Sequence, residues 1–305
     1  MSTEARNILV VSHTGRSDSL DAAVQVIAQL QDAGAVPVLQ RNEHDEIVAT
    51  GLTLDGVVIL HETVDPADLE LVIVLGGDGT ILRAAEMVRG YSAPMLGVNL
   101  GHVGFLAESE RDDLADAVRR VIARDYFVEE RLTLSVRVKV DKKVVYETWA
   151  LNEATVEKAS RERMLEVVIE VDGRPLSSFG CDGVVVSTPT GSTAYSFSAG
   201  GPIIWPSVEA ITMVPLSAHA LFARPIVVGP DSSLAVEVLK RTNGTGVLWC
   251  DGRRTHDLEP GSRVVVRRSS VPVRLARLHE SPFTDRLVKK FHLPVTGWRG
   301  PAASD

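Results

Sequence analysis

The sequence has few cysteines and no long apolar run. Its 305 residues include two cysteines, Cys181 and Cys250, which do not form a C-x-x-C pair. Two cysteines are too few for a disulfide framework, and their spacing does not suit a zinc or redox site. We therefore expect two buried thiols in a reducing compartment. Because no apolar stretch approaches the roughly 20 residues that cross a bilayer, we also expect no membrane partner.

The chain also lacks an excess of positive charge. Its 32 Lys and Arg residues against 40 Asp and Glu residues give a net charge of −8, which argues against a nucleic-acid partner. A local site for a small polyanion is compatible with that average. No positively charged segment precedes the first apolar residues, 8–11, so we expect no signal peptide and a cytoplasmic protein.

Length and hydrophobic pattern predict two domains. The composition, 45% hydrophobic and 24% charged, is that of a folded globular protein. Within residues 1–126, short apolar runs typical of buried parallel strands alternate with helical patterns, which predicts an open α/β domain with a mostly parallel sheet. Strands are expected at residues 8–11, 36–39, 57–60, 71–75 and 95–98, and helices at 18–31, 80–89 and 112–124.

The pattern changes near Tyr126. Beyond it, two-residue alternation and turn signals such as Asp172-Gly173 predict a mostly β domain over residues 127–280. Its strands are expected at residues 132–140, 143–151, 165–171, 183–187, 226–228, 234–239 and 263–266, with further turns at 141–143, 243–244 and 260–261. Residues 281–305 form a tail that we expect to pack on the first domain.

A glycine-rich turn carries the strongest chemical signal in the first domain. Residues 76–80 read Gly-Gly-Asp-Gly-Thr and stand between an apolar strand and a helical pattern. Glycines let backbone N–H groups approach a ligand, and a helix N-terminus favours a phosphate. Asp78 is unusual there because a carboxylate repels phosphate. It points to a general base for a hydroxyl or to a Mg²⁺-linked ligand, and a helix N-cap is the structural alternative.

Two common nucleotide motifs are missing, and two weaker polar loops are present. Neither the Walker A motif nor G-x-G-x-x-G occurs. Phe105 could stack on a base, although packing inside the protein is its default role, and His102 fits a loop histidine better than a catalyst. Asn152 and Glu153 can hydrogen-bond ribose hydroxyls and base edges, although a simple turn would explain the pair equally well.

A long run of hydroxyls and glycines follows a predicted strand of the second domain. The segment from Cys181 to Pro202 contains Ser-Thr-Pro-Thr-Gly-Ser-Thr-Ala-Tyr, ending at Tyr195. Such a loop offers neutral hydrogen-bond groups and close backbone approach, which suit a polyol or a nucleotide. The G-x-S-x-G motif of a serine hydrolase is not present in it.

Together these motifs resemble the NAD kinase family in order and separation. The resemblance rests on residues 76–80, the pair at 152–153 and the block from Asp182 to Pro202, and it covers most of the chain. The Gly-Asp-Gly turn alone is shared with diacylglycerol-type lipid kinases and 6-phosphofructokinases, so the later block decides among them. Val103, where many relatives have Leu, is a small departure. Further matches occur at Pro215-Leu216, His219, Arg224-Pro225-Ile226 and Asp251-Gly252.

The resemblance implies an activity and a set of site residues. It implies phosphorylation of the 2′-hydroxyl of the adenosine ribose of NAD, giving NADP, from ATP or inorganic polyphosphate with Mg²⁺ or another divalent metal cation. Asp78 would be the catalytic carboxylate that orients or deprotonates this hydroxyl. The implied phosphate-binding residues are Gly76, Gly77, Gly79 and Thr80. The implied NAD-binding residues are Asp78, Gly79, Phe105, Asn152, Glu153, Asp182, Thr190, Thr193, Ala194, Tyr195 and Ser198. Family members are commonly homo-oligomers, so a tetramer or dimer is expected; no metal ligand is assigned.

Two other functions remain open at this point. A lipid or sphingoid kinase of related fold would share the glycine turn but would need a more apolar acceptor cleft than the hydroxyl-rich loop offers. A non-catalytic dinucleotide sensor would need no carboxylate in the phosphate turn, so Asp78 argues against it.

Overall fold

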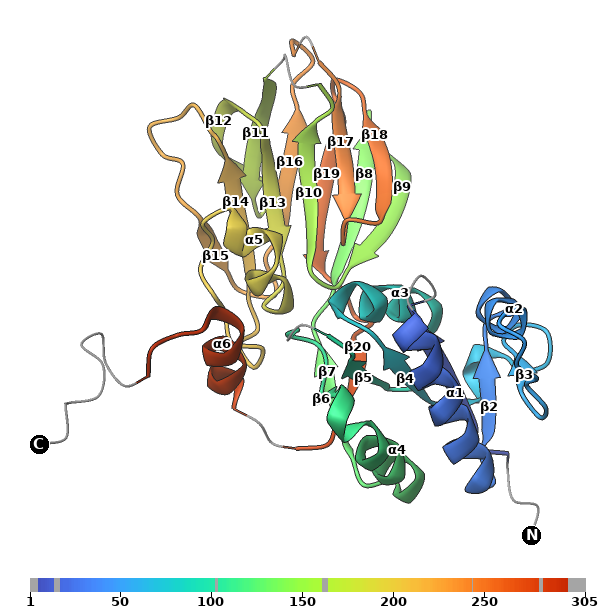
Figure 1. The fold of residues 1–305 in the computed structure, drawn as a ribbon. Coiled ribbons are helices and arrows are strands. Elements are labelled where there is room, and N and C mark those ends of the chain that lie inside the picture. The colour runs from blue at the N-terminus through green and yellow to red at the C-terminus, as the bar shows by residue number, and fades with distance from the viewer. Residues whose placement is uncertain are drawn as a thin grey trace, which may run out of the picture. The chain divides into compact units, whose positions relative to one another are not determined.

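The chain divides into two compact units. The computed structural model describes residues 5–13, 17–101, 104–160, 164–242, 244–279 and 282–295. One unit comprises residues 1–130 and 273–305, and the other comprises residues 131–272 (Figure 1). This differs from the division expected at 126 and 280, because β7 (Phe127–Arg131) and β20 (Val273–Arg277) extend the sheet of the first unit.

Three positions interpreted from the sequence lie outside the described residues. They are His102, Val103 and Asn243. Among the helices of the described segments, none combines the length and apolar character that crossing a membrane requires.

The first unit is built on a sheet with strand order β3-β2-β1-β4-β5-β20-β7, with β6 beside β5. The pairings from β3 through β20 are parallel, which confirms the expected α/β class. Its other strands are β1 (Asn7–Ser12), β2 (Val36–Leu39), β3 (Val58–Ile59), β4 (Leu69–Leu75), β5 (Met95–Asn99) and β6 (Ser109–Glu110).

Helices cover both faces of this sheet. Helices α1 (Ser17–Asp32) and α4 (Leu114–Ala123) share one apolar core with Leu96 and Val98 of β5. Residue Gly97 points to the opposite face because side chains alternate along a strand. There Ile81 of helix α3 (Asp78–Val88) packs so closely that a Cβ at Gly97 would lie 2.6 Å from it.

Helix α2 (Arg41–Ala49) was not predicted. Its sequence is mostly polar, and only Glu43 and Ile47 are buried, so no apolar stripe marks it as amphipathic. The remaining elements of this unit are the short 3-10 helices at Pro66–Asp68 and Arg111–Asp113 and the C-terminal helix α6 (Phe283–Phe291).

The second unit consists of two six-stranded antiparallel sheets. Their orders are β15-β14-β13-β10-β17-β18 and β12-β11-β16-β19-β8-β9. One apolar core draws buried residues from both sheets, which confirms a mostly β domain. The strands are β8 (Leu134–Val140), β9 (Lys143–Ala150), β10 (Glu153–Lys158), β11 (Leu165–Val171), β12 (Arg174–Cys181), β13 (Gly183–Ser187), β14 (Ile211–Leu216), β15 (Ile226–Val228), β16 (Leu234–Val238), β17 (Gly246–Cys250), β18 (Arg254–Leu258) and β19 (Arg263–Arg268).

Two of the strands that the sequence did not predict contain proline. Strand β12 has Pro175 and a run of serines, and β14 has Pro215, both unusual inside a sheet. Strands β6, β7, β10, β17, β18 and β20 were also missed. The expected turn at Asp172-Gly173 is confirmed, since φ is +52° and +76° at these two residues.

Candidate active site

The glycine-rich turn lies at the carboxyl end of β4. The strand ends at Leu75, and α3 begins at Asp78 with Gly77 as its N-cap. Gly76 has φ +155°, and a Cβ there would lie 2.5 Å from the Thr80 hydroxyl oxygen, so this position requires glycine. A helix N-terminus carries N–H groups that have no intrahelical acceptor, and it therefore suits a phosphate.

Gly77 and Gly79 form the open side of this turn. Both residues are exposed, and within the described chain a Cβ at either would meet no heavy atom within 4 Å. A ligand can therefore approach the backbone of the turn from solvent. The structure thus brings the four predicted phosphate-binding residues into one turn, with Gly76 and Thr80 buried beneath its open side.

Asp78 does not cap its helix. Its Oδ2 accepts a hydrogen bond from the Phe105 N–H and its Oδ1 from the Leu106 N–H, each at 3.1 Å. Gly104 permits this approach, because a Cβ there would lie 2.4 Å from Oδ1. The N-cap interpretation is wrong, since the cap position belongs to Gly77. The half-buried carboxylate is instead held in a fixed orientation by a neighbouring loop.

The parallel sheet explains why these two segments meet. Strands β4 and β5 are neighbours and parallel, with Leu75 opposite Val98, so the loops that follow them leave from the same edge. Ligands of open α/β sheets bind at this carboxyl edge. The order of β4 and β5 therefore places Asp78 where a substrate can reach it.

Phe105 has a packing role in the first unit. Its side chain is buried, and its ring centroid lies 6.0 Å from that of Phe283 and 5.9 Å from that of Phe291, both on α6. Aromatic rings at such distances stabilise each other. The implied role of Phe105 near adenine is a prediction that these contacts do not test.

In the second unit, Asp251 organises the Asn152–Glu153 pair. Its carboxylate accepts hydrogen bonds from the N–H groups of Leu151 (2.9 Å), Asn152 (2.7 Å) and Glu153 (3.3 Å). Asp251 also pairs with Arg254 at 2.7 Å. Because Asp251 directly follows β17, which pairs with β10, the sheet register brings it to the start of β10. Its place in the sequence gave no sign of this contact.

Glu153 is buried beside that carboxylate. Burial, reinforced by repulsion from Asp251, raises the pKa of Glu153 to about 8. The Tyr195 backbone N–H donates to the Glu153 carboxyl, whereas its Oε2 has no partner among the described residues. At neutral pH the side chain is mostly protonated, so it can both donate to and accept from a ligand.

The hydroxyls of the loop after β13 serve the loop itself. Thr188 Oγ1 donates to the Leu151 carbonyl at 2.5 Å and accepts from the Gly191 N–H at 3.0 Å. Ser192 Oγ bonds the Pro189 carbonyl at 2.6 Å. A Cβ at Gly191 would lie 2.0 Å from the Asn152 carbonyl oxygen. The loop is therefore seated directly on the Asn152–Glu153 segment.

Five more of the predicted NAD-binding residues belong to this loop and to the short helices in it. Thr190 and Thr193 belong to a 3-10 helix (Thr190–Thr193), and Tyr195 and Ser198 to the short helix α5 (Tyr195–Ser198), with Ala194 between them. The Tyr195 side chain is 40% exposed. Its phenol group has a raised pKa because of desolvation and then the carboxylates of Glu157, Glu153 and Asp182.

Asp182 stands at the opposite end of β13 from the hydroxyl loop. It forms an ion pair with Lys158, and this contact lowers the pKa of the carboxyl below its ordinary value. The charge of Asp182 contributes to the raised pKa of the Tyr195 phenol.

A divalent cation would find few ligands in the protein itself. Within the described ranges, no group of three or more His, Cys, Asp or Glu side chains is placed to hold a metal ion. Mg²⁺ often takes only one or two carboxylates and completes its shell with water and substrate phosphates. The half-buried carboxylate of Asp78 beside the glycine turn fits that minimal role.

Comparison with known sequences matches both units. The model of the ATP-NAD kinase N-terminal domain matches residues 8–126, and that of the ATP-NAD kinase C-terminal domain matches residues 151–278. An NAD kinase of Leifsonia xyli subsp. xyli (strain CTCB07) is 72% identical over 300 residues, covering 98% of this chain and 99% of the relative. An NAD kinase of Thermobifida fusca (strain YX) is 58% identical over 306 residues, covering 99% and 94%.

Solved structures of two kinases are similar to this chain. Yeast NADH kinase complexed with NADH superposes with a TM-score of 0.85 at 25% identity, covering 96% of this chain and 89% of that one. An Archaeoglobus fulgidus NAD kinase in complex with ATP shows the shared fold, with a TM-score of 0.68 at 22% identity over 95% and 100% of the two chains. The relatives therefore agree with the motifs and not with a lipid kinase, and this chain belongs to the NAD kinase family of phosphotransferases.

Proposed function

We propose that the protein transfers a phosphoryl group to the 2′-hydroxyl of the adenosine ribose of NAD, giving NADP. ATP or inorganic polyphosphate is the proposed donor, and Mg²⁺ or another divalent cation the proposed cofactor. The observation that carries the proposal is the carboxylate of Asp78, which follows a glycine-rich turn and is held by the N–H groups of Phe105 and Leu106.

Asp78 is the proposed general base. A ribose hydroxyl is a weak nucleophile at neutral pH, and an aimed carboxylate that accepts its proton contributes roughly 10²–10⁴-fold to such a reaction. Each Asp78 oxygen accepts one backbone N–H, and each retains a lone pair for a hydroxyl. The two hydrogen bonds fix the direction of those lone pairs, which is the positioning that phosphoryl transfer depends on.

The Asn152–Glu153 segment and the loop over it are the proposed nucleotide-binding surface. The buried Glu153 Oε2 has no partner within the described chain, and a buried polar atom of this kind is costly unless a ligand satisfies it. A nucleotide hydroxyl or amino group supplies such a partner. Tyr195, which is partly exposed next to it, offers a ring for stacking on adenine.

Negative charge on the donor is met locally, because the protein as a whole has a net charge of −8. The N–H groups at the start of α3 and the exposed backbone of Gly77 and Gly79 are suited to hold donor phosphates. A divalent cation would neutralise charge on the transferring phosphoryl group. Asp78 is the proposed protein contact for such a cation.

One assay matrix tests the proposal. NAD or NADH is offered with ATP or polyphosphate, with and without Mg²⁺, and NADP(H) is detected. Product is expected from NAD with at least one donor, only when the cation is present. The Asp78→Asn protein is the matched control, with the same fold and little product. An absence of NADP(H) under every condition would overturn the proposed function.

A homo-oligomer, tetramer or dimer, is also proposed from the family resemblance. Light scattering of the purified chain measures its mass in solution. A monomeric mass together with full activity contradicts this part of the proposal.

A further inference from the structure

The loop that holds Asp78 is itself held by the C-terminal helix. Phe105 donates its N–H to Asp78, while its carbonyl oxygen accepts from Arg286 Nη1 at 3.0 Å. The same nitrogen donates to the Ala107 carbonyl at 3.1 Å. Arg286 lies on α6, 181 positions further along the chain than Phe105. One guanidinium thus fixes the carbonyls on both sides of Leu106, the second donor to Asp78.

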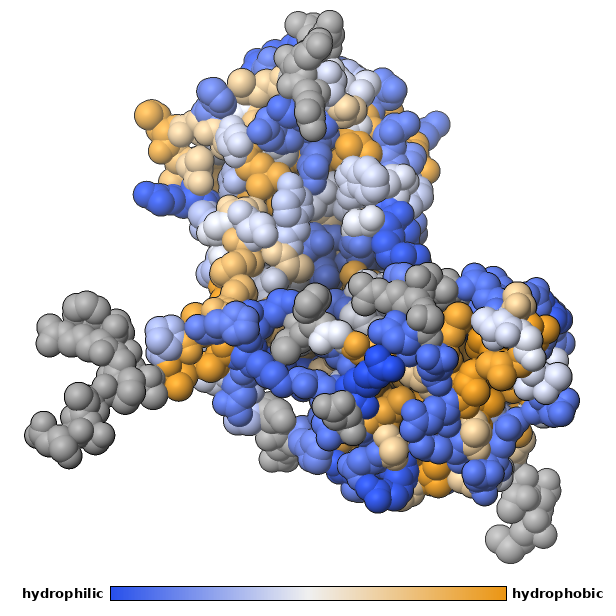
Figure 2. Space-filling model, in the orientation of Figure 1, coloured by the Kyte–Doolittle hydropathy of each residue, from blue (hydrophilic) through white to orange (hydrophobic). Residues whose placement is uncertain are grey.

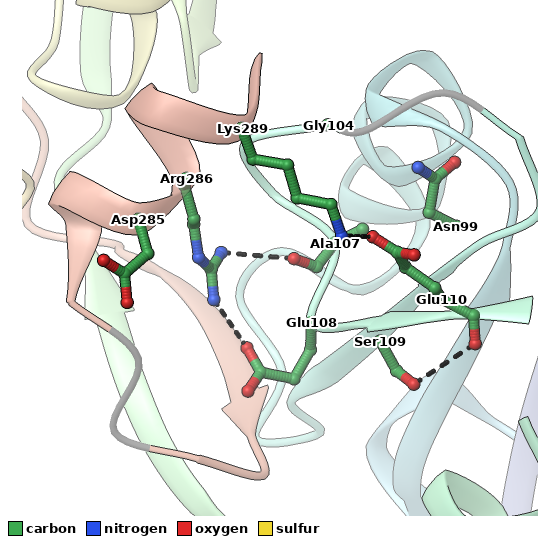
Figure 3. Close-up of a pocket in the computed structure, with 9 residues that line it drawn as sticks. All are labelled: Asn99, Gly104, Ala107, Glu108, Ser109, Glu110, Asp285, Arg286 and Lys289. Carbon is green, nitrogen blue, oxygen red and sulfur yellow. Dashed lines mark hydrogen bonds and ion pairs between the residues drawn. The ribbon is translucent and has the colours of Figure 1, made fainter. Parts of the chain in front are cut away.

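A buried glutamate fixes Arg286 in turn. Glu108 Oε2 accepts from Arg286 Nη2 at 2.8 Å, and the Glu108 side chain is only 1% exposed (Figure 3). Its other oxygen accepts the N–H groups of Leu278 and His279, each at 3.1 Å. A carboxylate held this way cannot follow a moving partner, so it sets the position of the guanidinium.

Arg277 of β20 completes the support. Its Nη1 donates to the Leu106 carbonyl at 3.2 Å and to Glu108 Oε2 at 3.0 Å, and its Nε donates to Glu129 at 2.6 Å. The carbonyls of residues 105, 106 and 107 are therefore all bound by arginines from the C-terminal part of the chain. The N–H groups of residues 105 and 106 are left to point at Asp78.

The apolar side of α6 packs against the same loop. Phe283 and Phe291 flank the Phe105 ring, and Leu287 between them is buried. The Glu108 carboxylate beside it is buried, and hydrogen bonds to a buried charged group are stronger than the same bonds in water. Apolar contacts thus hold the C-terminal helix against the loop, and one arginine of this helix binds the carbonyls of the loop.

We propose that Arg286 is a positioning residue for Asp78, acting through the backbone of residues 105–107. The proposal rests on the proposed function, in which Asp78 accepts the proton of the acceptor hydroxyl. Arg286 touches no reacting atom in this account. It holds the loop at the distance that aims the carboxylate, and displacements of about 1 Å at such a site cost about 10²-fold in rate.

Kinetics of Arg286→Met and Arg286→Lys test this role in the full-length protein. We expect Arg286→Met to lower kcat by about tenfold or more with the KM for NAD within about twofold, because aim is lost and binding is kept. Arg286→Lys retains a cation for Glu108 but lacks the planar guanidinium that binds the carboxylate and two carbonyls. Its kcat should therefore lie between that of the wild-type protein and that of Arg286→Met. Lys290→Met, an exposed cation on the same helix, is the control and should change kcat by less than about twofold.

The same substitution in the Asp78→Asn background separates positioning from general weakening. If Arg286 acts through Asp78, Arg286→Met should lower the residual rate of Asp78→Asn by less than about twofold. An equal fold-loss in both backgrounds, or an unchanged kcat in the wild-type background, would overturn the proposal.

Hydrogen exchange supplies a readout that does not depend on activity. In Arg286→Met and Arg286→Lys, the amides of Phe105 and Leu106 should exchange faster while those of β4 and β5 keep their protection. Unchanged exchange at these two amides overturns the positioning role even if the enzyme is active. A wild-type protein that makes no NADP but shows this exchange pattern would instead overturn the proposed function and leave the loop support in place.

Discussion

Asp78 in the first unit and Asp251 in the second use the same device in opposite ways. Each carboxylate accepts hydrogen bonds from consecutive backbone N–H groups. Asp251 has a side chain only 2% exposed and is paired with Arg254, so its hydrogen-bonding capacity is used within the protein. Asp78 is half-buried at the mouth of an open turn. In the second unit the carboxylate orients a loop, whereas in the first the loop orients the carboxylate.

The two carboxylates differ in whether they keep lone pairs available for a substrate. A catalytic carboxylate needs lone pairs directed at a substrate, whereas a structural carboxylate has all of its lone pairs occupied within the protein. The same contrast holds for the hydroxyls and glycines. Those after β13 are mostly bound inside the loop, whereas Gly77 and Gly79 are open to solvent. Four substitutions test this distinction.

Asp78→Asn should have the largest effect. The amide cannot accept a proton from the acceptor hydroxyl, so kcat should fall by roughly 10²–10⁴-fold. NAD affinity should change little. The free energy of unfolding should fall by about 1–3 kcal/mol, because the amide NH2 cannot accept the second backbone N–H of residues 105 and 106. Steady-state kinetics, calorimetric titration with NAD and urea unfolding measure the three quantities. Near-normal turnover in a folded variant would remove Asp78 from the catalytic role.

Asp251→Ala should act mainly on stability. It leaves Arg254 and three backbone N–H groups without their carboxylate, and breaking a buried pair costs about 3–5 kcal/mol of unfolding free energy. Asp257→Ala, at an exposed position of β18, is the control and should cost no more than about 0.5 kcal/mol. Equal unfolding midpoints in urea for the two variants would contradict the assigned difference.

Gly191→Ala tests how tightly the hydroxyl loop sits on the Asn152–Glu153 segment. The new Cβ would lie 2.0 Å from the Asn152 carbonyl oxygen, and such overpacking costs about 1–3 kcal/mol. Since the backbone of Asn152 must shift, the KM for NAD should also rise. Gly229→Ala, where the described residues place no heavy atom within 4 Å of a Cβ, should alter neither quantity. A wild-type KM and stability for Gly191→Ala would show that the loop yields freely.

Glu153→Gln should change how the stability depends on pH. The folded pKa of about 8 lies above the ordinary value of 4.5, so between these values the folded state binds one proton more than the unfolded state. The contribution of Glu153 to stability is therefore complete below about pH 4.5 and is lost as pH rises toward about 8, with a slope of at most about 1.4 kcal/mol per pH unit.

The measurement is urea unfolding of both proteins at several pH values from 5 to 8.5. The wild-type free energy of unfolding should fall more steeply than that of Glu153→Gln up to about pH 8, and the two curves should run parallel above it. Parallel curves over the whole range would mean that Glu153 is ionised in the folded protein.

Much of the fold could be predicted because buried strands appear in the sequence as runs of apolar residues. Strands β2, β11, β13 and β15 begin and end where the apolar runs and turn residues predict. Helix α2 and strands β12 and β14 could not be predicted, because they are held by tertiary contacts and not by their own periodicity. Residues 273–277 fall within the range expected for the second domain, yet they form strand β20, which pairs with β5 of the first unit. Pairing across long sequence separations leaves no local signal.

The candidate site divides in the same way. The glycine turn, Asp78 and the Asn152–Glu153 pair stand out in the sequence because together they match the family's motifs in order and separation. Glu108 and Arg286 do not stand out, since a single charged residue looks like a surface residue in the sequence.

The sequence by itself determined the two-unit architecture, the family and the residues of the glycine-rich turn. Backbone conformational preferences and the periodicity of buried residues are local properties, so they can be recognised in the sequence. The tertiary structure alone decided which groups act on one another. It placed the N–H groups of Phe105 and Leu106 on Asp78, Asp251 beneath Asn152, and Arg286 behind the loop. Hydrogen bonds between segments more than 25 positions apart follow from strand order and register, and these are properties of the folded sheet.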